Sequence, residues 1–337
     1  MRRDRTCPHG RLETLVVDSE VLSSNLLGDP TVRNVHVYLP PGHRADQALP
    51  LLVDLVGYSG SGLSHTNWRN FGENVPERVD RLIAEEGMPP VVIAFPDCFT
   101  RLGGNQYINS VAVGRYEDFL IDEVVPVVEQ AFGCGGPGRR GVFGKSSGGY
   151  GAIVHAMRRA DTWAAVACHS GDMGFDLMYL GNFPHTLRVL ARHDLSVERF
   201  MNAFENANKD TQEMVGVLEH LLMSATYDPS PEHFLGVRLP VDVDTCELIP
   251  ERWANWQAWD PLSLIDRHAG DLTRLRSVYF DCGDRDQCNL VYGARRLHRE
   301  LGRRGVQHVY EEFPDDHTNI DYRMNRSLPL LARALSS

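Results

Sequence analysis

The sequence lacks the features that mark membrane-spanning and secreted proteins. No apolar run approaches the roughly 18 residues that a transmembrane helix needs, and the charged start at 1–9 has no apolar segment behind it, which argues against a secretory signal peptide. The seven cysteines are an odd number at irregular spacing, so they outline no disulfide framework. Cys282 and Cys288 could pair, but free buried thiols are the expected state. We therefore expect a cytoplasmic protein with no membrane partner.

Positive charge and metal-binding motifs are also scarce. Lys and Arg number 34 against 45 for Asp and Glu, which gives a net charge of −11. Nucleic acids and anionic membrane surfaces require a clustered positive field, and no basic stretch longer than a pair stands out, so no nucleic-acid partner is expected. The motif H-E-x-x-H and paired C-x-x-C motifs are absent, so the sequence implies no metal and no organic cofactor.

Short apolar runs alternate with helix-like segments along most of the chain. This alternation is typical of the α/β class, with a mostly parallel central sheet and helices on both faces. The run 49–56 is interrupted only by Asp54, as expected of a strand buried on both sides. An amphipathic helix is expected over 117–131. Strands are expected at 35–39, 49–56, 90–95, 140–143, 163–168, 277–281 and 306–313.

The interval 171–265 breaks this alternation. Its pattern is mostly helical, and it is punctuated by Pro229, Pro231, Pro240 and Pro250. The simplest organisation is an α/β body formed by 1–170 and 266–337, with 171–265 inserted between two strands as a helical lid. Such a lid could also serve as an oligomerisation surface, so a homodimer is possible.

The segment 144–148, GKSSG, fits the nucleophile elbow G-x-S-x-G. A serine at a sharp turn from strand to helix presents its hydroxyl above the sheet, so Ser146 is the predicted nucleophile. The N–H of Ser147 begins the following helix and is the first predicted donor to an oxyanion. A phosphate-binding loop is the rival interpretation, but its first glycine would fall on Arg139.

A serine needs a base and an orienting acid, which follow an elbow in the order Ser, Asp or Glu, His. His317 lies in the turn after the last predicted strand, where this arrangement places the general base. Asp286 lies in the loop after strand 277–281 and is the predicted acid, with Asp284 as the alternative. For either aspartate, the alternative is a purely structural role in capping a turn.

Further candidates line the loops near the predicted strand ends and the insertion. The glycine-rich loop at 57–62 offers the N–H of Tyr58 as a second oxyanion donor, although a loop without catalytic duty is the alternative. A second group could bind substrate, but ordinary turn residues and aromatic packing between lid and body explain it as well. Its members are Asn105, Tyr107, Asn109, Trp253, Trp256 and Trp259.

These motifs together resemble the Putative esterase family, which includes S-formylglutathione hydrolase (esterase D), enterochelin esterase and the mycolyltransferases. The resemblance spans nearly the whole body, from VYLPPG at 37–42 through SSGGYG at 146–151 to His317. It implies an α/β-hydrolase fold and a serine esterase acting on a small or medium ester. It also implies that Ser146, Asp286 and His317 form a catalytic triad, with Tyr58 and Ser147 as oxyanion donors.

The chain departs from the family at three motifs, and one of them is the elbow, whose residues Lys145 and Ser147 are less usual. Family members often carry His-Gly at the oxyanion loop, where this chain has VG at 56–57, and Gly-His where it has Asp316 and His317. The insertion at 171–265 is also longer than in compact members. These departures leave the reaction type intact and leave the substrate open. An acyltransferase with the same triad, or a catalytically inactive ligand-binding member, are the alternatives.

Overall fold

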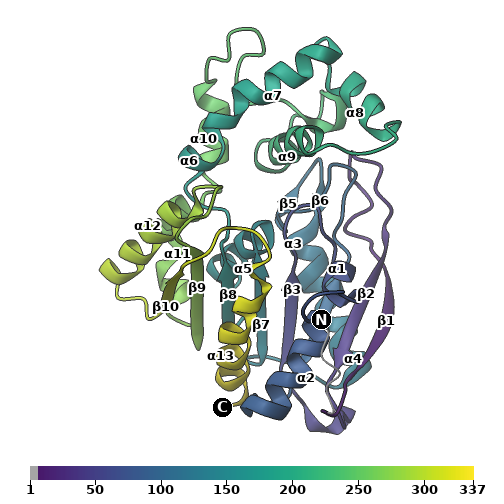
Figure 1. Cartoon of the computed structure of the whole chain (residues 1–337), viewed down its shortest axis with the longest axis vertical. Coiled ribbons are helices and arrows are strands. Elements are labelled where there is room, and N and C mark those ends of the chain that lie inside the picture. The colour runs from purple at the N-terminus through teal and green to yellow at the C-terminus, as the bar shows by residue number, and fades with distance from the viewer. Residues whose placement is uncertain (1–6) are drawn as a thin grey trace.

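The structure, a computed structural model, describes residues 7–337 (Figure 1). Residues 1–6, which belong to the charged start considered above, lie outside the described residues. The chain forms a sheet of eight strands in the order β1-β2-β4-β3-β7-β8-β9-β10, and a separate two-stranded sheet pairs β5 with β6. The class expected from the sequence, α/β with a mostly parallel sheet, is confirmed.

Five of the seven pairings in the large sheet are parallel, and the two antiparallel pairings involve β2. The expected strands are all present, with ends shifted by a few residues. β1 forms the antiparallel edge and was not among the expected strands. The bounds are β1 Arg11–Asp18, β2 Val32–Leu39, β3 Leu51–Leu55, β4 Val92–Pro96, β5 Asn109–Ser110, β6 Gly114–Arg115, β7 Arg140–Lys145, β8 Ala165–His169, β9 Ser277–Gly283 and β10 Val309–Phe313.

The central strands are apolar because both of their faces are covered. Every residue of β3, β4 and β8 is buried, and alternate residues contribute to two separate cores. Side chains from α2 and α13 fill one core, and α4, α5, α11 and α12 contribute to the other. Their bounds are α2 Val75–Glu86, α4 Val125–Phe132, α5 Ser147–Arg158, α11 Pro261–Leu272, α12 Leu290–Arg303 and α13 Met324–Ser336.

The helix expected over 117–131 is present but is not a uniform α-helix. It begins as α3 (Tyr116–Asp118), continues as a π-helical stretch (Phe119–Val124) and ends as α4. Pro126 lies in the first turn of α4 and has no N–H to donate to the preceding turn. The helical type changes just before this proline.

The chain between β8 and β9 forms a largely helical layer above the sheet (Figure 1). A cluster of aromatic rings holds this layer together, including Phe183, Tyr227 and Trp256. α11 instead packs on α5 beside the sheet, so the predicted boundary between 265 and 266 falls inside this helix. The layer's own helices are α6 Phe175–Met178, α7 Phe183–Leu190, α8 Val197–Glu205, α9 Gln212–Tyr227 and α10 Pro250–Gln257.

Two expectations about the chain as a whole concern cysteine and membranes. All seven cysteines are free thiols, so Cys282 and Cys288 are not paired. Within residues 7–337 no helix combines the length and the apolar character needed to cross a membrane.

Candidate active site

Ser146 occupies the turn between β7 and α5 in a strained backbone conformation. Its φ of 56° and ψ of −126° lie in a region that residues with a side chain rarely adopt. The turn is also crowded, because a Cβ at Gly144 would lie 2.3 Å from the carbonyl oxygen of Leu55, and one at Gly148 only 1.8 Å from it. Only glycine fits at these two positions, which explains the spacing of the GKSSG segment.

The structure brings Ser146, His317 and Asp286 together in one hydrogen-bonded chain. Ser146 Oγ lies 2.9 Å from His317 Nε2, and His317 Nδ1 lies 2.8 Å from Asp286 Oδ2. The second carboxylate oxygen of Asp286 accepts a hydrogen bond from the backbone N–H of Cys288, at 2.9 Å. The three residues lie 140 and 31 positions apart in sequence, at the ends of different strands.

Asp284, the alternative acid, points elsewhere. Its side chain is 44% exposed and pairs with Arg285 at 3.4 Å. Asp286 is 6% exposed, and its backbone N–H bonds to the carbonyl of Gly283 in a tight turn after β9. This turn directs the Asp286 carboxylate toward the imidazole of His317.

Asp286, Cys288 and His317 also form a group whose potential ligand atoms lie within 4.8 Å of one another, in the part of the chain that the structure describes. A metal ion here would compete with the hydrogen bond between His317 and Asp286. It would also have to displace the thiol proton of Cys288, whose pKa burial raises to about 12. The arrangement suits proton transfer better than metal binding.

The two predicted oxyanion donors lie on either side of Ser146. Ser147 opens α5, so its N–H belongs to the first turn, where amides have no helical acceptor. The loop that carries Tyr58 packs directly against the elbow, because a Cβ at Gly57 would lie 3.3 Å from the Cβ of Ser146. The side chain of Tyr58 holds this loop in place by donating to the carbonyl of Leu102 at 3.0 Å.

A hollow of about 330 Å³ opens in front of Ser146 and has a polar lining. Lys145 lies at its wall, and burial lowers the pKa of this lysine. Asp54, the one charged residue of the buried strand β3, pairs with His65 of this hollow at 2.5 Å. Burial opposes charge on His65, but the carboxylate of Asp54 outweighs it and raises the His65 pKa.

A buried polar network behind the elbow was missed by the sequence analysis. Gln106 Nε2 donates to Asp172 Oδ2 at 3.1 Å and to Ser147 Oγ at 3.0 Å, and Ser147 Oγ lies 3.3 Å from Asp172. Burial raises the pKa of Asp172 to about 6, although the bonds from Gln106 and Ser147 oppose the rise. The one signal in the sequence is that Asp172 closely follows β8, the strand next to the elbow strand.

The six residues considered for substrate binding do not line this hollow. Asn105 and Tyr107 are buried and bond to backbone groups, with Tyr107 Oη donating to the carbonyl of Val56 at 2.6 Å. Asn109 accepts a hydrogen bond from the N–H of Asp118 at 3.2 Å. All three therefore hold loops of the body.

The three tryptophans of the group lie in the packing of the insertion. Trp253 and Trp256 belong to its aromatic cluster, with ring centroids 5.9 Å apart. Trp259 contacts the guanidinium of Arg158 on α5, 4.9 Å from the ring centroid. All three rings pack against protein. Contact of these rings with substrate remains a prediction.

Comparison with known proteins adds family and fold. The model of the family described as Putative esterase matches residues 24–325. A ferulic acid esterase structure matches with a TM-score of 0.63 and 18% identity, over 97% of this chain and 99% of that one. A fluorophosphonate-binding serine hydrolase of Staphylococcus aureus matches with a TM-score of 0.59 and 17% identity, over 96% and 99%. An S-formylglutathione hydrolase from Agrobacterium tumefaciens matches with a TM-score of 0.56 and 14% identity, over 98% of each chain.

At these identities the solved structures establish likeness of fold, which is the α/β-hydrolase fold. The fold expected from the sequence is thereby confirmed. No curated protein matches the sequence.

Proposed function

The chain belongs to the Putative esterase family and is a serine esterase, and on that premise we propose that it hydrolyses small or medium carboxylic esters through an acyl-enzyme on Ser146. The observation that carries the proposal is the hydrogen-bonded chain of Ser146, His317 and Asp286 at the edge of an accessible hollow. In this proposal the helical layer within 171–265 acts as a lid over the site, and the partner is a small-molecule ester.

In the first step Ser146 Oγ attacks the acyl carbon while its proton passes to His317 Nε2. The hydrogen bond of 2.9 Å between these atoms is within the range needed for that transfer. Asp286 holds the imidazole in the tautomer that leaves Nε2 free to accept, and its charge stabilises the imidazolium. The ester C–O bond then breaks, and His317 returns the proton to the leaving alcohol.

The negative charge of the tetrahedral intermediate requires donors that are already in place. The N–H groups of Tyr58 and Ser147 fill this role in the proposal, since the first lies on the loop against the elbow and the second at the start of α5. Water then attacks the acyl-enzyme with His317 as base, which releases the carboxylic acid and restores Ser146.

A fluorophosphonate probe tests the nucleophile directly. We expect it to form one adduct per chain, located on Ser146 by mass spectrometry of the digested protein, and to be slowed by excess p-nitrophenyl acetate. The matched control is Ser147→Ala, which keeps the neighbouring nucleophile and should still be labelled. A folded protein that stays unlabelled, or that is labelled at another serine, would overturn the proposal.

A further inference from the structure

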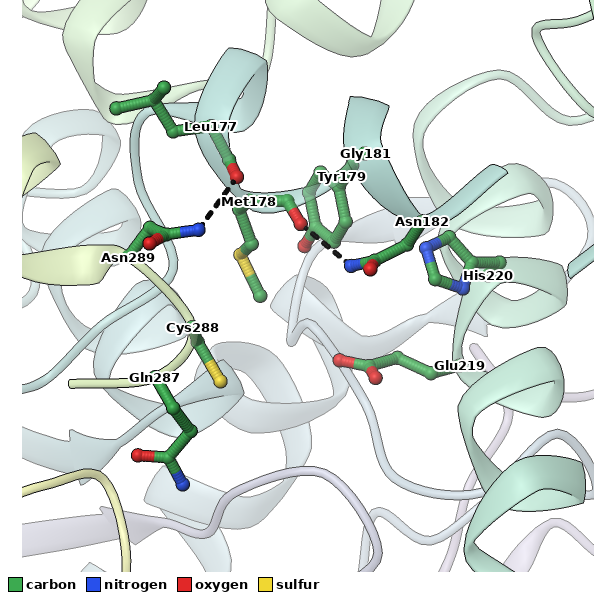
Figure 2. Close-up of a pocket in the computed structure, with 10 residues that line it drawn as sticks. All are labelled: Leu177, Met178, Tyr179, Gly181, Asn182, Glu219, His220, Gln287, Cys288 and Asn289. Atoms are coloured by element: carbon green, nitrogen blue, oxygen red, sulfur yellow. Dashed lines mark hydrogen bonds between the residues drawn. The ribbon is translucent and has the colours of Figure 1, made fainter. Parts of the chain in front are cut away.

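A second hollow, of about 210 Å³, lies between the insertion and the loop before α12 (Figure 2). We call it the side pocket; its lining comes from the chain after β8, from α9 and from the loop before α12. Two of its residues touch the candidate triad. Gln287 Oε1 accepts the backbone N–H of His317 at 3.0 Å, and Cys288 Sγ lies within 4.8 Å of the His317 imidazole. A group held in this pocket is therefore close to an ester positioned at Ser146.

Polar side-chain groups without hydrogen-bond partners line the side pocket. Figure 2 shows the carboxylate of Glu219 extending from α9 toward Cys288. Among the described residues no hydrogen bond or ion pair engages this carboxylate. His220 is 5% exposed, its Nδ1 bonds to the carbonyl of Gly216 at 2.9 Å, and its Nε2 has no partner. Since Nδ1 must donate its hydrogen to that carbonyl, Nε2 presents a lone pair.

The electrostatics of the side pocket favour a positive ligand. No lysine or arginine is among its lining residues, and burial lowers the pKa of His220 to about 4, so this imidazole is neutral. Burial, followed by repulsion from Asp172, raises the pKa of Glu219 to about 8. The other titratable groups facing Glu219 are Tyr58, Tyr179 and Cys288, which are neutral acids with raised pKa values.

We propose that the side pocket is a subsite for an ammonium group on the substrate, with the Glu219 carboxylate as its counter-charge and His220 Nε2 as a second acceptor. An ammonium supplies hydrogen-bond donors to His220 Nε2 and to the carboxylate of Glu219 in its ionised form. The proposal rests on the ester hydrolysis proposed above and names the class of ester: one that carries an amine.

Small probes test the charge preference without knowing the substrate. Butylammonium, butan-1-ol and butyrate have matched chains and differ in charge, and each is measured as an inhibitor of p-nitrophenyl acetate hydrolysis. We expect butylammonium to bind competitively and about tenfold more tightly than butan-1-ol, as expected for a hydrogen bond to a charged group. Equal affinity for the alcohol, or preference for butyrate, would overturn the proposal even if no variant folded.

Two variants assign the effect to the carboxylate. Glu219→Gln should reduce the preference for butylammonium over butan-1-ol to within about twofold. Glu213→Gln removes the same charge from the same helix, where Glu213 pairs with Arg192 at 2.8 Å on the surface, and should keep the preference. Loss of the preference in both variants would point to general attraction by the acidic chain, and no loss in Glu219→Gln would rule out this subsite.

The pH dependence of binding adds a signature that is specific to Glu219. An ammonium binds the ionised carboxylate, so affinity for butylammonium should rise about tenfold or more from pH 6.5 to 8.5, below the pKa of the amine. The rise should be absent from Glu219→Gln, and its persistence there would contradict the proposal.

Calorimetry on Ser146→Ala separates this proposal from the proposed function. Butylammonium should still bind this variant, because the side pocket does not include Ser146. Binding together with an inactive wild-type protein would sink the esterase proposal and retain the subsite. Hydrolysis by the wild-type protein without ammonium binding would retain the esterase proposal and overturn the subsite.

Discussion

The molecule contains two chains of hydrogen-bonded side chains, each made of a serine, a histidine and an aspartate. Their hydrogen-bond lengths are nearly the same. In the first, which we call the active-site chain after its proposed role, Ser146 lies 2.9 Å from His317, which lies 2.8 Å from Asp286. In the second, which we call the buried chain, Ser327 Oγ lies 2.8 Å from His169 Nε2, and His169 Nδ1 lies 2.7 Å from Asp281 Oδ1. Connectivity alone therefore does not distinguish a catalytic triad.

Access and backbone separate the two chains. Ser327 is fully buried within α13, and His169 and Asp281 are 2% and 1% exposed. Ser146 instead lies at a strained turn and lines a hollow. Because Ser327 has no accessible surface, an ester cannot reach its hydroxyl.

The buried chain has a different role, which is to anchor the sheet beneath the elbow. Asp281 also accepts hydrogen bonds from Tyr279 at 2.7 Å and from Arg323 at 2.8 Å, so β9 is tied to the segment that leads into α13. The carbonyl of His169 accepts the backbone N–H of Ser146 at 2.9 Å. The buried chain thus supports the backbone that presents Ser146, the proposed nucleophile.

The sharpest test of this contrast replaces the two serines. Ser146→Ala should lower kcat for p-nitrophenyl acetate by about 10⁶-fold, as loss of a nucleophile does in other serine hydrolases. Ser327→Ala should keep kcat within about threefold and cost about 1 kcal/mol of folding free energy, because only a hydrogen bond to His169 is lost. Steady-state kinetics and urea unfolding measure the two effects. A large loss of kcat in folded Ser327→Ala would break the comparison.

Replacement of the acid in the active-site chain should have the next largest effect. Asp286→Asn leaves the shape intact but favours the wrong imidazole tautomer, so kcat should fall by about 10⁴-fold. Asp284→Asn is the matched control, since its exposed carboxylate pairs with Arg285 only, and should stay within about threefold. If the control lost more activity than Asp286→Asn, the two aspartates would have to exchange roles.

The contrast also shows what the sequence can reveal. The elbow, the histidine after the last strand and the aspartate after β9 could be predicted because each follows a recognisable strand end. β1 could not, since an edge strand with exposed side chains has a weak pattern. Gln106, Asp172 and Glu219 come from separate segments that meet only in the folded chain.

The buried chain could not be predicted from the sequence either, because nothing local marks Ser327, near the start of α13, as a partner of His169. Ser327 and His169 are 158 positions apart in the sequence, and they meet at a face of the sheet. His169 begins the segment HSG at 169–171, and the sequence around it assigns no role to this histidine. Local patterns identify where strands end, and tertiary packing decides which polar groups meet.

The acid of the buried chain should matter for stability. Asp281→Asn would leave the Arg323 guanidinium without its carboxylate and remove the partner of His169, so the free energy of unfolding should fall by about 3–5 kcal/mol. Thermal and urea unfolding measure the loss. Asp284→Asn, at the exposed residue just after the same strand, should change stability by less than about 0.5 kcal/mol. Similar values for both variants would mean that the buried chain does not anchor β9.

The smallest expected effect is a pH dependence that belongs to the buried chain. Burial opposes ionisation of Asp281, but the charge of His169 and the hydrogen bonds from His169, Arg323 and Tyr279 outweigh it, so its pKa lies below the usual value. A carboxyl with a lowered pKa stabilises the folded state above its unfolded pKa of about 4, and this contribution is lost as pH falls through the folded-state value.

The stability of the wild-type protein should therefore fall more steeply below about pH 4 than that of Asp281→Asn, by about 1.4 kcal/mol for each unit by which the pKa is lowered. Urea midpoints measured at pH 3 and pH 6 for both proteins give the difference directly, and the subtraction removes the contribution of other carboxyls. Parallel pH profiles would show that Asp281 is not ionised in the folded protein. The buried chain would then lack a carboxylate, and its contrast with the active-site chain would rest on access to the hollow and on backbone conformation.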